Sequence, residues 1–190
     1  MSQKALTYAE ALTYLASIQN GTSLPKVQGR VIRSGTKYIA GLAAGLAAKN
    51  GLLIEASTLP ATGLNNFPKG NMLPKGTYLL VIGARILFDT TASVALPTAA
   101  WKSEAPANWK NGELKISQNG TGILFETSIT DVTNFKSSTG NDDDFRDIVP
   151  VLLRPESAFD FQVALASGAV TDQAYKLELR VIEIVDPTGN

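Results

Sequence analysis

The strongest structural signal in this sequence comes from two stretches, Phe159-Asp-Phe-Gln-Val-Ala-Leu-Ala166 and Tyr175-Lys-Leu-Glu-Leu-Arg-Val181. In both stretches apolar residues alternate with polar or small ones, which is the period of a β-strand with one buried face. The apolar positions lie two residues apart, so they share one side of each strand. The pattern predicts two strands that cover a hydrophobic core with one face.

Further strands are expected on the N-terminal side of these two. Residues 78–89 form a nearly continuous apolar run, which is typical of a central strand covered on both faces, and Gly83 within it is a candidate bulge. Asn119-Gly120 predicts a tight hairpin turn. The last strand is expected to continue to residue 185 past a register change at Val181. The remaining expected strands are residues 52–56, 92–96, 113–117, 122–132 and 148–153.

These strands are short and the loops between them are uneven, which favours a Greek-key sandwich over an evenly spaced meander. We therefore expect an all-β protein, a two-sheet antiparallel jelly-roll sandwich with an N-terminal helical or extended arm. The chain has 190 residues, of which 44% are hydrophobic, and it contains no cysteine. A core of this size forms without disulfide bridges.

The N-terminal part of the sequence has a different pattern. Residues 8–18 carry apolar side chains three and four positions apart, which predicts a short amphipathic helix. Residues 27–39 are expected to be extended, and residues 38–49 a second helix. Prolines and glycines are dense over residues 59–76, which predicts a loop or crossing segment.

The domain boundary is expected within that loop. Residues 1–76 form an N-terminal arm with short helices and a Pro/Gly-rich crossing segment, and residues 77–190 form the jelly-roll body. The first 50 residues carry six basic side chains and one acidic side chain, although the net charge of the whole chain is zero. This asymmetry indicates an anionic partner for the arm or a solvated basic surface, with Arg30, Arg33 and Lys37 as candidate contacts.

Composition argues against common catalytic chemistries. The chain has no histidine and no cysteine, which removes the usual general base, the thiol nucleophile and the best transition-metal ligands. Glycine loops of the kind that hold phosphate are also absent. Carboxylates on expected strands, such as Glu113, Glu126, Glu178 and Glu183, are expected to face outward from the sheets. We therefore expect no enzymatic activity and no cofactor.

The densest acidic cluster consists of Asp142, Asp143, Asp144 and Asp147. Carboxylate oxygens suit calcium, but the cluster lacks the glycine and the glutamate of an EF-hand loop. It is therefore a weak calcium candidate. The favoured interpretation is a solvated loop, or an interface loop that contacts the basic arm of a neighbouring copy.

Trp101 and Trp109 bracket a short loop. Exposed tryptophans in such a loop stack on sugars or anchor a protein interface, whereas buried ones fix the loop to the rim of the sandwich. Rim packing is favoured, and the interface and glycan interpretations stay open.

Three segments carry a resemblance to a known family: Trp109-Lys-Asn-Gly-Glu-Leu-Lys-Ile-Ser-Gln-Asn-Gly120, Val149-Pro-Val-Leu-Leu-Arg-Pro155 and Leu177-Glu-Leu-Arg-Val-Ile-Glu-Ile184. In order and pattern they resemble the single jelly-roll structural proteins of icosahedral viruses, particularly capsid proteins of tailless bacteriophages. The resemblance implies a shell of many identical subunits, with an N-terminal arm that lies under neighbours or faces the interior. The arm here lacks the dense arginine tract of strongly genome-binding coat proteins.

The sequence therefore predicts a viral structural protein of the virion capsid, assembled in the host cytoplasm, which forms a shell or vertex through lateral jelly-roll contacts and its arm. Its expected partners are copies of itself, with other capsid proteins, the genome or an internal membrane as further candidates. The alternative is a glycan-binding or receptor-binding β-sandwich, such as a spike or adhesin module, that uses the two tryptophans and the aspartate loop.

Overall fold

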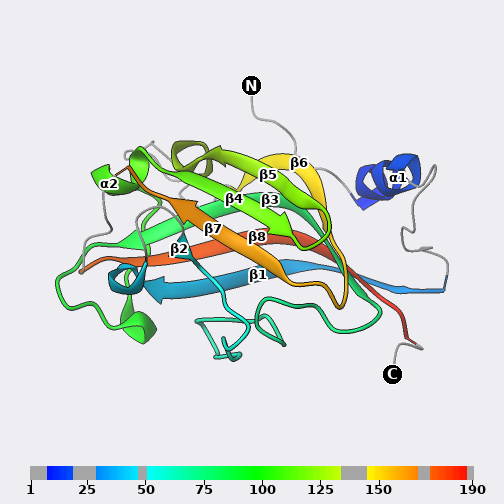
Figure 1. The fold of residues 1–190 in the computed structure, drawn as a ribbon, viewed down its shortest axis with the longest axis horizontal. Helices are drawn as coiled ribbons and strands as arrows, with labels where there is room; N and C mark the ends of the chain where they lie inside the picture. Colours follow the sequence, from blue (N-terminus) through cyan, green and yellow to red (C-terminus); the bar gives the residue numbers. More distant parts are fainter. Residues whose placement is uncertain (1–7, 19–28, 47–50, 134–144, 167–171, 188–190) are drawn as a thin grey trace.

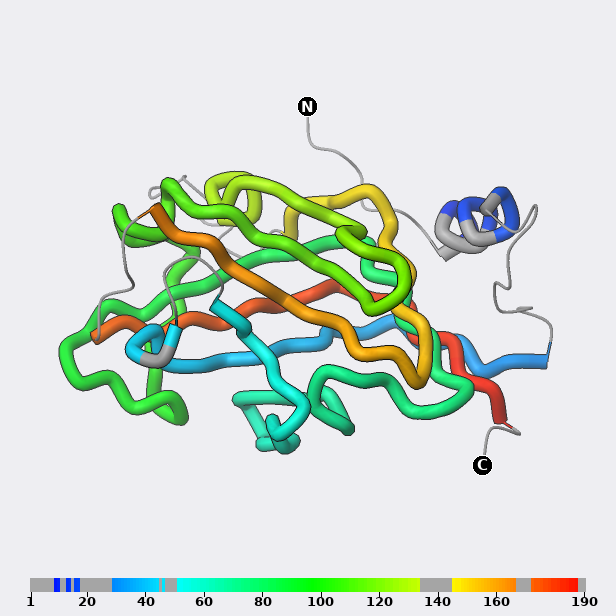
Figure 2. Tube along the Cα trace, in the orientation of Figure 1, coloured from blue at the N-terminus to red at the C-terminus, as the bar shows by residue number. Residues whose placement is uncertain are grey.

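The computed structural model describes residues 8–18, 29–46, 51–133, 145–166 and 172–187. Its strands lie in two layers that pack face to face (Figure 1, Figure 2). The helices and strands are α1 (Tyr8–Ile18), β1 (Val31–Leu42), β2 (Gly51–Leu52), β3 (Thr77–Asp89), α2 (Ala107–Lys110), β4 (Glu113–Gln118), β5 (Gly122–Ser128), β6 (Arg146–Leu153), β7 (Phe159–Ala164) and β8 (Ala174–Val185). Short 3₁₀ turns occupy Ala43–Gly45 (η1), Leu96–Thr98 (η2) and Ile129–Val132 (η3).

The strands of the described residues form two four-stranded antiparallel sheets. Sheet A has the order β1-β8-β3-β6, and sheet B has the order β2-β7-β4-β5. The first strand pairs with the last, the second with the seventh, the third with the sixth and the fourth with the fifth. The chain is therefore one long hairpin wrapped into two layers, which is the double Greek key of a jelly roll. The fold class predicted from the sequence is confirmed.

The hydrophobic core lies between the two sheets. Phe159 and Phe161 of β7 and Leu177 and Leu179 of β8 are fully buried there, as the alternation predicts. Phe67, from the loop before β3, lies between the sheets with its ring centroid 5.5 Å from those of Phe159 and Phe161. Aromatic rings in this tilted arrangement bury large apolar areas and fix the separation of the layers.

Two local predictions are confirmed. The register of β3 against both of its neighbours shifts between Val81 and Gly83, which is the predicted bulge. The turn at Asn119-Gly120 joins β4 to β5, and Gly120 has φ +81°, a value that favours glycine. The register change expected at Val181-Ile182 lies one position away: the pairing of β8 with β3 shifts between Arg180 and Val181, and the extra residue belongs to β3.

The strand predicted over residues 92–96 is wrong. Asp89, the last residue of β3, accepts hydrogen bonds from the backbone N–H groups of Thr91 (2.8 Å) and Ala100 (2.6 Å), which turn the chain away from the sheet. These bonds, those from Thr91 foremost, lower the pKa of the Asp89 carboxyl. Pro97 then lies within the 3₁₀ turn η2, where its fixed φ is favourable.

Two further strands are shorter than predicted. In place of the strand expected over residues 52–56, the structure has β2, which consists of Gly51–Leu52. The strand expected over 122–132 ends at Ser128, whose hydroxyl accepts the N–H of Thr130 and so starts η3. A side-chain oxygen that caps backbone groups in this way competes with continued strand pairing.

The boundary expected at residue 76 does not separate an arm from the body. Strand β1 pairs with β8 from Val31, opposite Val185, to Leu42, opposite Ala174, so it is a full member of sheet A. The helix predicted over residues 38–49 is also wrong, because β1 continues to Leu42 and η1 follows. The reason is tertiary, since the pairing with β8 overrides a local pattern of alanine and leucine at helical spacing.

Helix α1 is confirmed over the predicted residues 8–18. The Tyr14 hydroxyl lies 3.4 Å from the Pro150 carbonyl oxygen of β6, so the helix contacts sheet A in the same chain. In the described part of the chain, no helix combines the length and hydropathy that a bilayer crossing needs.

Candidate functional site

Of the three predicted basic contacts, Arg30 lies just before β1 and Arg33 and Lys37 lie within it, and the three differ in their partners. Arg30 forms an ion pair with Asp186 at 3.3 Å, and Lys37 forms one with Glu183 of β8 at 3.4 Å. Arg33 is exposed, and no described acidic side chain pairs with it. Two of the three cations are therefore committed within the chain, and Arg33 is the one left for a partner.

The predicted acidic cluster is described at one position. Asp142, Asp143 and Asp144 lie outside the described residues, so the calcium and interface interpretations of that loop stay predictions. Asp147 lies in β6, where its carboxylate is 3.6 Å from the Arg180 guanidinium of β8. The described residues contain no group of three or more acidic side chains that could hold a metal ion.

The two tryptophans have different environments. Trp109, in α2, is fully buried, its ring packs edge-on to Phe88 at 5.0 Å, and its indole N–H donates to Gln173 at 3.0 Å. The interface and glycan interpretations of Trp109 are therefore wrong, because none of its surface is accessible. Trp101 is partly exposed, with the Lys176 ammonium 6.0 Å from its ring centroid.

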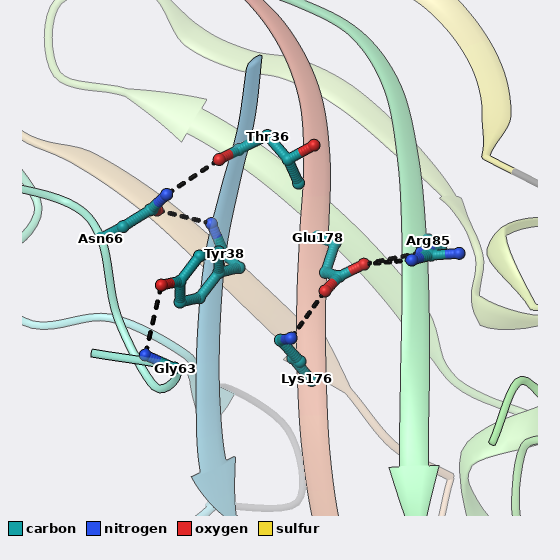
Figure 3. A network of polar contacts seen from close by, with 7 residues as sticks. All are labelled: Thr36, Tyr38, Gly63, Asn66, Arg85, Lys176 and Glu178. Atoms are coloured by element: carbon teal, nitrogen blue, oxygen red, sulfur yellow. Dashed lines mark hydrogen bonds and ion pairs between the residues drawn. The ribbon is translucent and has the colours of Figure 1, made fainter. Parts of the chain in front are cut away.

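The outer face of sheet A carries a charged network that Figure 3 shows. Glu178 of β8 is buried and lies 2.7 Å from both the Arg85 guanidinium of β3 and the Lys176 ammonium. The alternation in the sequence predicts that Glu178 lies on this outer face, but it does not predict that the side chain is buried. Removing one cationic partner from a buried carboxylate costs folding free energy. This network therefore has a structural role.

Phe145 extends this network toward the predicted acidic loop. Its ring lies under the guanidinium groups of Arg85 and Arg180, at 4.6 and 4.7 Å from the ring centroid. Phe145 is the residue next to Asp144 in the sequence. Phe145 is therefore held on the outer face of sheet A by two cation–π contacts.

One half of the free edge of β1 is covered by the loop before β3, as Figure 3 shows. The Asn66 side chain accepts the N–H of Tyr38 and donates to the carbonyl of Thr36, both at 2.8 Å. The Asn66 N–H donates to the Tyr38 carbonyl, and the Ala40 N–H donates to the Leu64 carbonyl. This short segment takes the place of a neighbouring strand over residues 36–40.

Along the other half of the same edge, the outward backbone groups of β1 have no partner among the described residues. In an antiparallel ladder the N–H and C=O of one residue point to one side, and those of the next to the other side. Ala43 bonds to Gln173 on the β8 side, so the odd-numbered residues of β1 point toward β8. The N–H and C=O groups of Ile32 and Ser34, and the N–H of Thr36, point away from β8, and no described residue bonds to them.

Comparisons with known proteins add a structural likeness. No protein-family model matches the chain, and no curated protein matches it. Among solved structures, it is similar to a chain of the cyanophage Pam1 capsid asymmetric unit. The TM-score is 0.37 and the sequence identity 14%, over 88% of this chain and 95% of that chain.

The open edge was missed at the sequence level. Val31, Arg33 and Lys37 fall in the segment predicted to be extended, but the sequence does not show that this segment pairs with β8. A cavity of about 120 Å³ lies beside this edge, lined by residues 33–37 together with Val181 and Glu183. The alternation of Ile32, Ser34 and Thr36 on one side could have indicated a strand, but not its free edge.

Proposed function

We propose that this protein is a viral structural protein that assembles with copies of itself into a capsid shell or vertex. The observation that supports this best is the strand order, β1-β8-β3-β6 facing β2-β7-β4-β5, which is the complete eight-stranded jelly roll. Capsid proteins, lectin domains and cupins are the common uses of this fold. The proposal includes no catalytic role.

The packed interior favours a shell protein over an internal binding site. Trp109, Phe67, Phe88, Phe159 and Phe161 are among the largest fully buried side chains, and they fill the space between the sheets. A cupin holds its metal between the sheets with histidines, and this chain has none. Burial of Trp109 likewise removes half of the tryptophan pair on which the glycan-binding alternative depends.

Surface charge supplies the lateral contact. Arg33 is exposed on β1, and we place it against an acidic segment of a neighbouring copy, for which Asp142, Asp143 and Asp144 are the candidates. Opposite charges on two surfaces steer association and fix its register, although each exposed pair adds little affinity. Of the predicted arm, helix α1 is the described element that is not a strand of either sheet.

Light scattering coupled to size exclusion, followed by electron microscopy, tests the assembly role. The purified full chain is expected to form closed shells, vertices or defined oligomers as its concentration rises. A protein that stays a monodisperse monomer at millimolar concentration, with or without divalent cations, would contradict the proposal.

A truncation tests the arm. Removal of residues 2–50 would delete β1 and unfold sheet A, so the informative variant lacks residues 2–28 and keeps every strand. It is expected to fold with a cooperative transition and to lose higher assembly. Normal assembly by this variant would leave the sandwich alone as the assembling unit.

A further inference from the structure

We propose that the open edge of β1, residues 31–36, pairs with the same edge of a second copy of this chain. The two strands run antiparallel about a two-fold axis, with Ser34 opposite Ser34 of the second copy, so that sheet A continues across both molecules. This contact would be one specific interface of the proposed shell. The inference therefore rests on the proposed shell-forming function.

Unpaired backbone groups are the first observation behind this inference. The outward N–H and C=O groups of Ile32 and Ser34 have no partner in the described part of the chain, and Ser34, Gly35 and Thr36 are exposed. A strand edge of this kind is a template for another strand. The neighbouring residues 36–40 are already covered by the Asn66 segment, which limits the free length.

The positions whose backbone groups point outward on this edge carry no proline, bulge or charged side chain, although the exposed Arg33 lies between them. Natural edge strands are blocked by lysine, proline or bulges. The outer face of this stretch holds Ile32, Ser34 and Thr36, which are uncharged, and the pairing of β1 with β8 is continuous from residue 31 to residue 42.

Two features determine the register of the proposed pairing: which residues direct their backbone groups outward, and the charge of Arg33. Hydrogen bonding requires even-numbered residues to face even-numbered residues, which allows Ser34 opposite Ser34 or offsets of one pair in either direction. An offset that places Arg33 opposite Arg33 brings like charges together, which is unfavourable. With Ser34 at the centre, Arg33 lies opposite Gly35 of the second copy, and space is open around Gly35.

This contact is small, so the isolated pair is expected to be weak. A few hydrogen bonds between short strands bury much less area than a standard stable interface. We therefore expect the contact to be populated at high protein concentration, or within a larger assembly that adds other contacts.

Cysteine cross-linking provides a direct test, because the chain has no cysteine of its own. In the proposed register the two Ser34 Cα atoms lie about 5.5 Å apart, within reach of a disulfide. Ser34→Cys is expected to form a disulfide-linked dimer under mild oxidation about tenfold faster than the control. The control is Ser57→Cys, an exposed serine in the loop after β2. Equal rates for the two variants would contradict the proposal.

Charge complementation identifies the partner as a second copy. Ser34→Lys and Ser34→Glu each place like charges opposite one another, so each variant alone is expected to lose pairing. An equimolar mixture is expected to recover it as a mixed pair. Recovery with either variant alone would point to a different partner strand and would overturn the inference.

The experiments distinguish a failure of the edge pairing from a failure of the proposed capsid function. Normal shells from Ser34→Lys would overturn the edge pairing and leave the capsid role in place. A wild-type chain that never assembles, but whose Ser34→Cys variant cross-links selectively, would support the pairing and contradict the shell. Thermal melting of each variant confirms that the exposed substitution leaves the sandwich folded.

Discussion

The two halves of β1 have the same partner strand but different surroundings. Residues 37–42 pair with β8 and bury Ile39 in the core, and the Asn66 segment covers their other edge at Tyr38 and Ala40. Residues 31–36 also pair with β8, yet no described residue bonds to their other edge before the Thr36 carbonyl, and Val31 is 43% exposed. Pairing with β8 therefore forms the whole strand. The loop before β3 determines which half of the strand also has hydrogen-bond partners along its other edge.

The largest expected difference between the halves comes from side-chain truncation. Ile39→Ala removes a side chain that is 3% exposed and is expected to cost about 2–4 kcal/mol of unfolding free energy. Val31→Ala, in the open half, is expected to cost about 0.5 kcal/mol or less. Urea denaturation of both variants measures the contrast. Equal losses would mean that the open half is as deeply packed as the covered half.

Two glycines sharpen the same comparison. A Cβ at Gly41 would lie 2.5 Å from the Tyr175 hydroxyl oxygen and 2.7 Å from the ring, so Gly41→Ala must displace a buried aromatic side chain. The expected loss is about 1–3 kcal/mol. A Cβ at Gly35 meets nothing within 4 Å, so Gly35→Ala is expected to be neutral or to stabilise by up to about 1 kcal/mol. Thermal melts of the two variants should shift in opposite directions or differ clearly in size.

Local pattern explains which strands could be predicted from the sequence. The alternation in β7 and β8, the bulge at Gly83 and the turn at Asn119-Gly120 all depend on residues close together in the chain, and the structure confirms each. Strand β1 was assigned to an arm because its residues pair with β8, far away in the sequence. Residues such as Val31, Ile32 and Tyr38 favour a strand, but the local pattern does not show which strand β1 pairs with.

Asn66 is the next test, since its side chain covers the edge of β1. Asn66→Ala removes the hydrogen bonds to the Tyr38 N–H and the Thr36 carbonyl and is expected to cost about 1–2 kcal/mol. The Tyr38 amide should exchange with solvent faster in the variant, approaching the behaviour of the Ser34 amide in the wild type. Unchanged exchange at Tyr38 would show that the backbone bonds of the loop are sufficient. Ser34→Ala is the matched control and should change neither quantity.

Long-range partners also explain the limits of the site prediction. Arg30, Arg33 and Lys37 were treated as one basic patch, but Asp186 and Glu183 from the other end of the chain neutralise two of them. Trp109 could be placed on a loop, while its burial depends on Phe88 and Gln173 in other elements. Charge and hydropathy identified the residue types, and the folded structure shows which of them are paired or buried within the chain.

The smallest expected effect separates the two cations of β1. Lys37 and Glu183 have side chains 16% and 22% exposed, so a double-mutant cycle with Lys37→Gln and Glu183→Gln should give a coupling of about 0.5–1 kcal/mol that decreases with added salt. Arg33→Gln, in the same strand, is expected to leave the unfolding free energy unchanged because no described carboxylate pairs with it. If Arg33→Gln destabilises the isolated chain as much as Lys37→Gln, Arg33 contributes to the fold. If Arg33→Gln instead leaves stability intact and weakens assembly, Arg33 acts between molecules. That result would agree with its exposed position in residues 31–36 of β1.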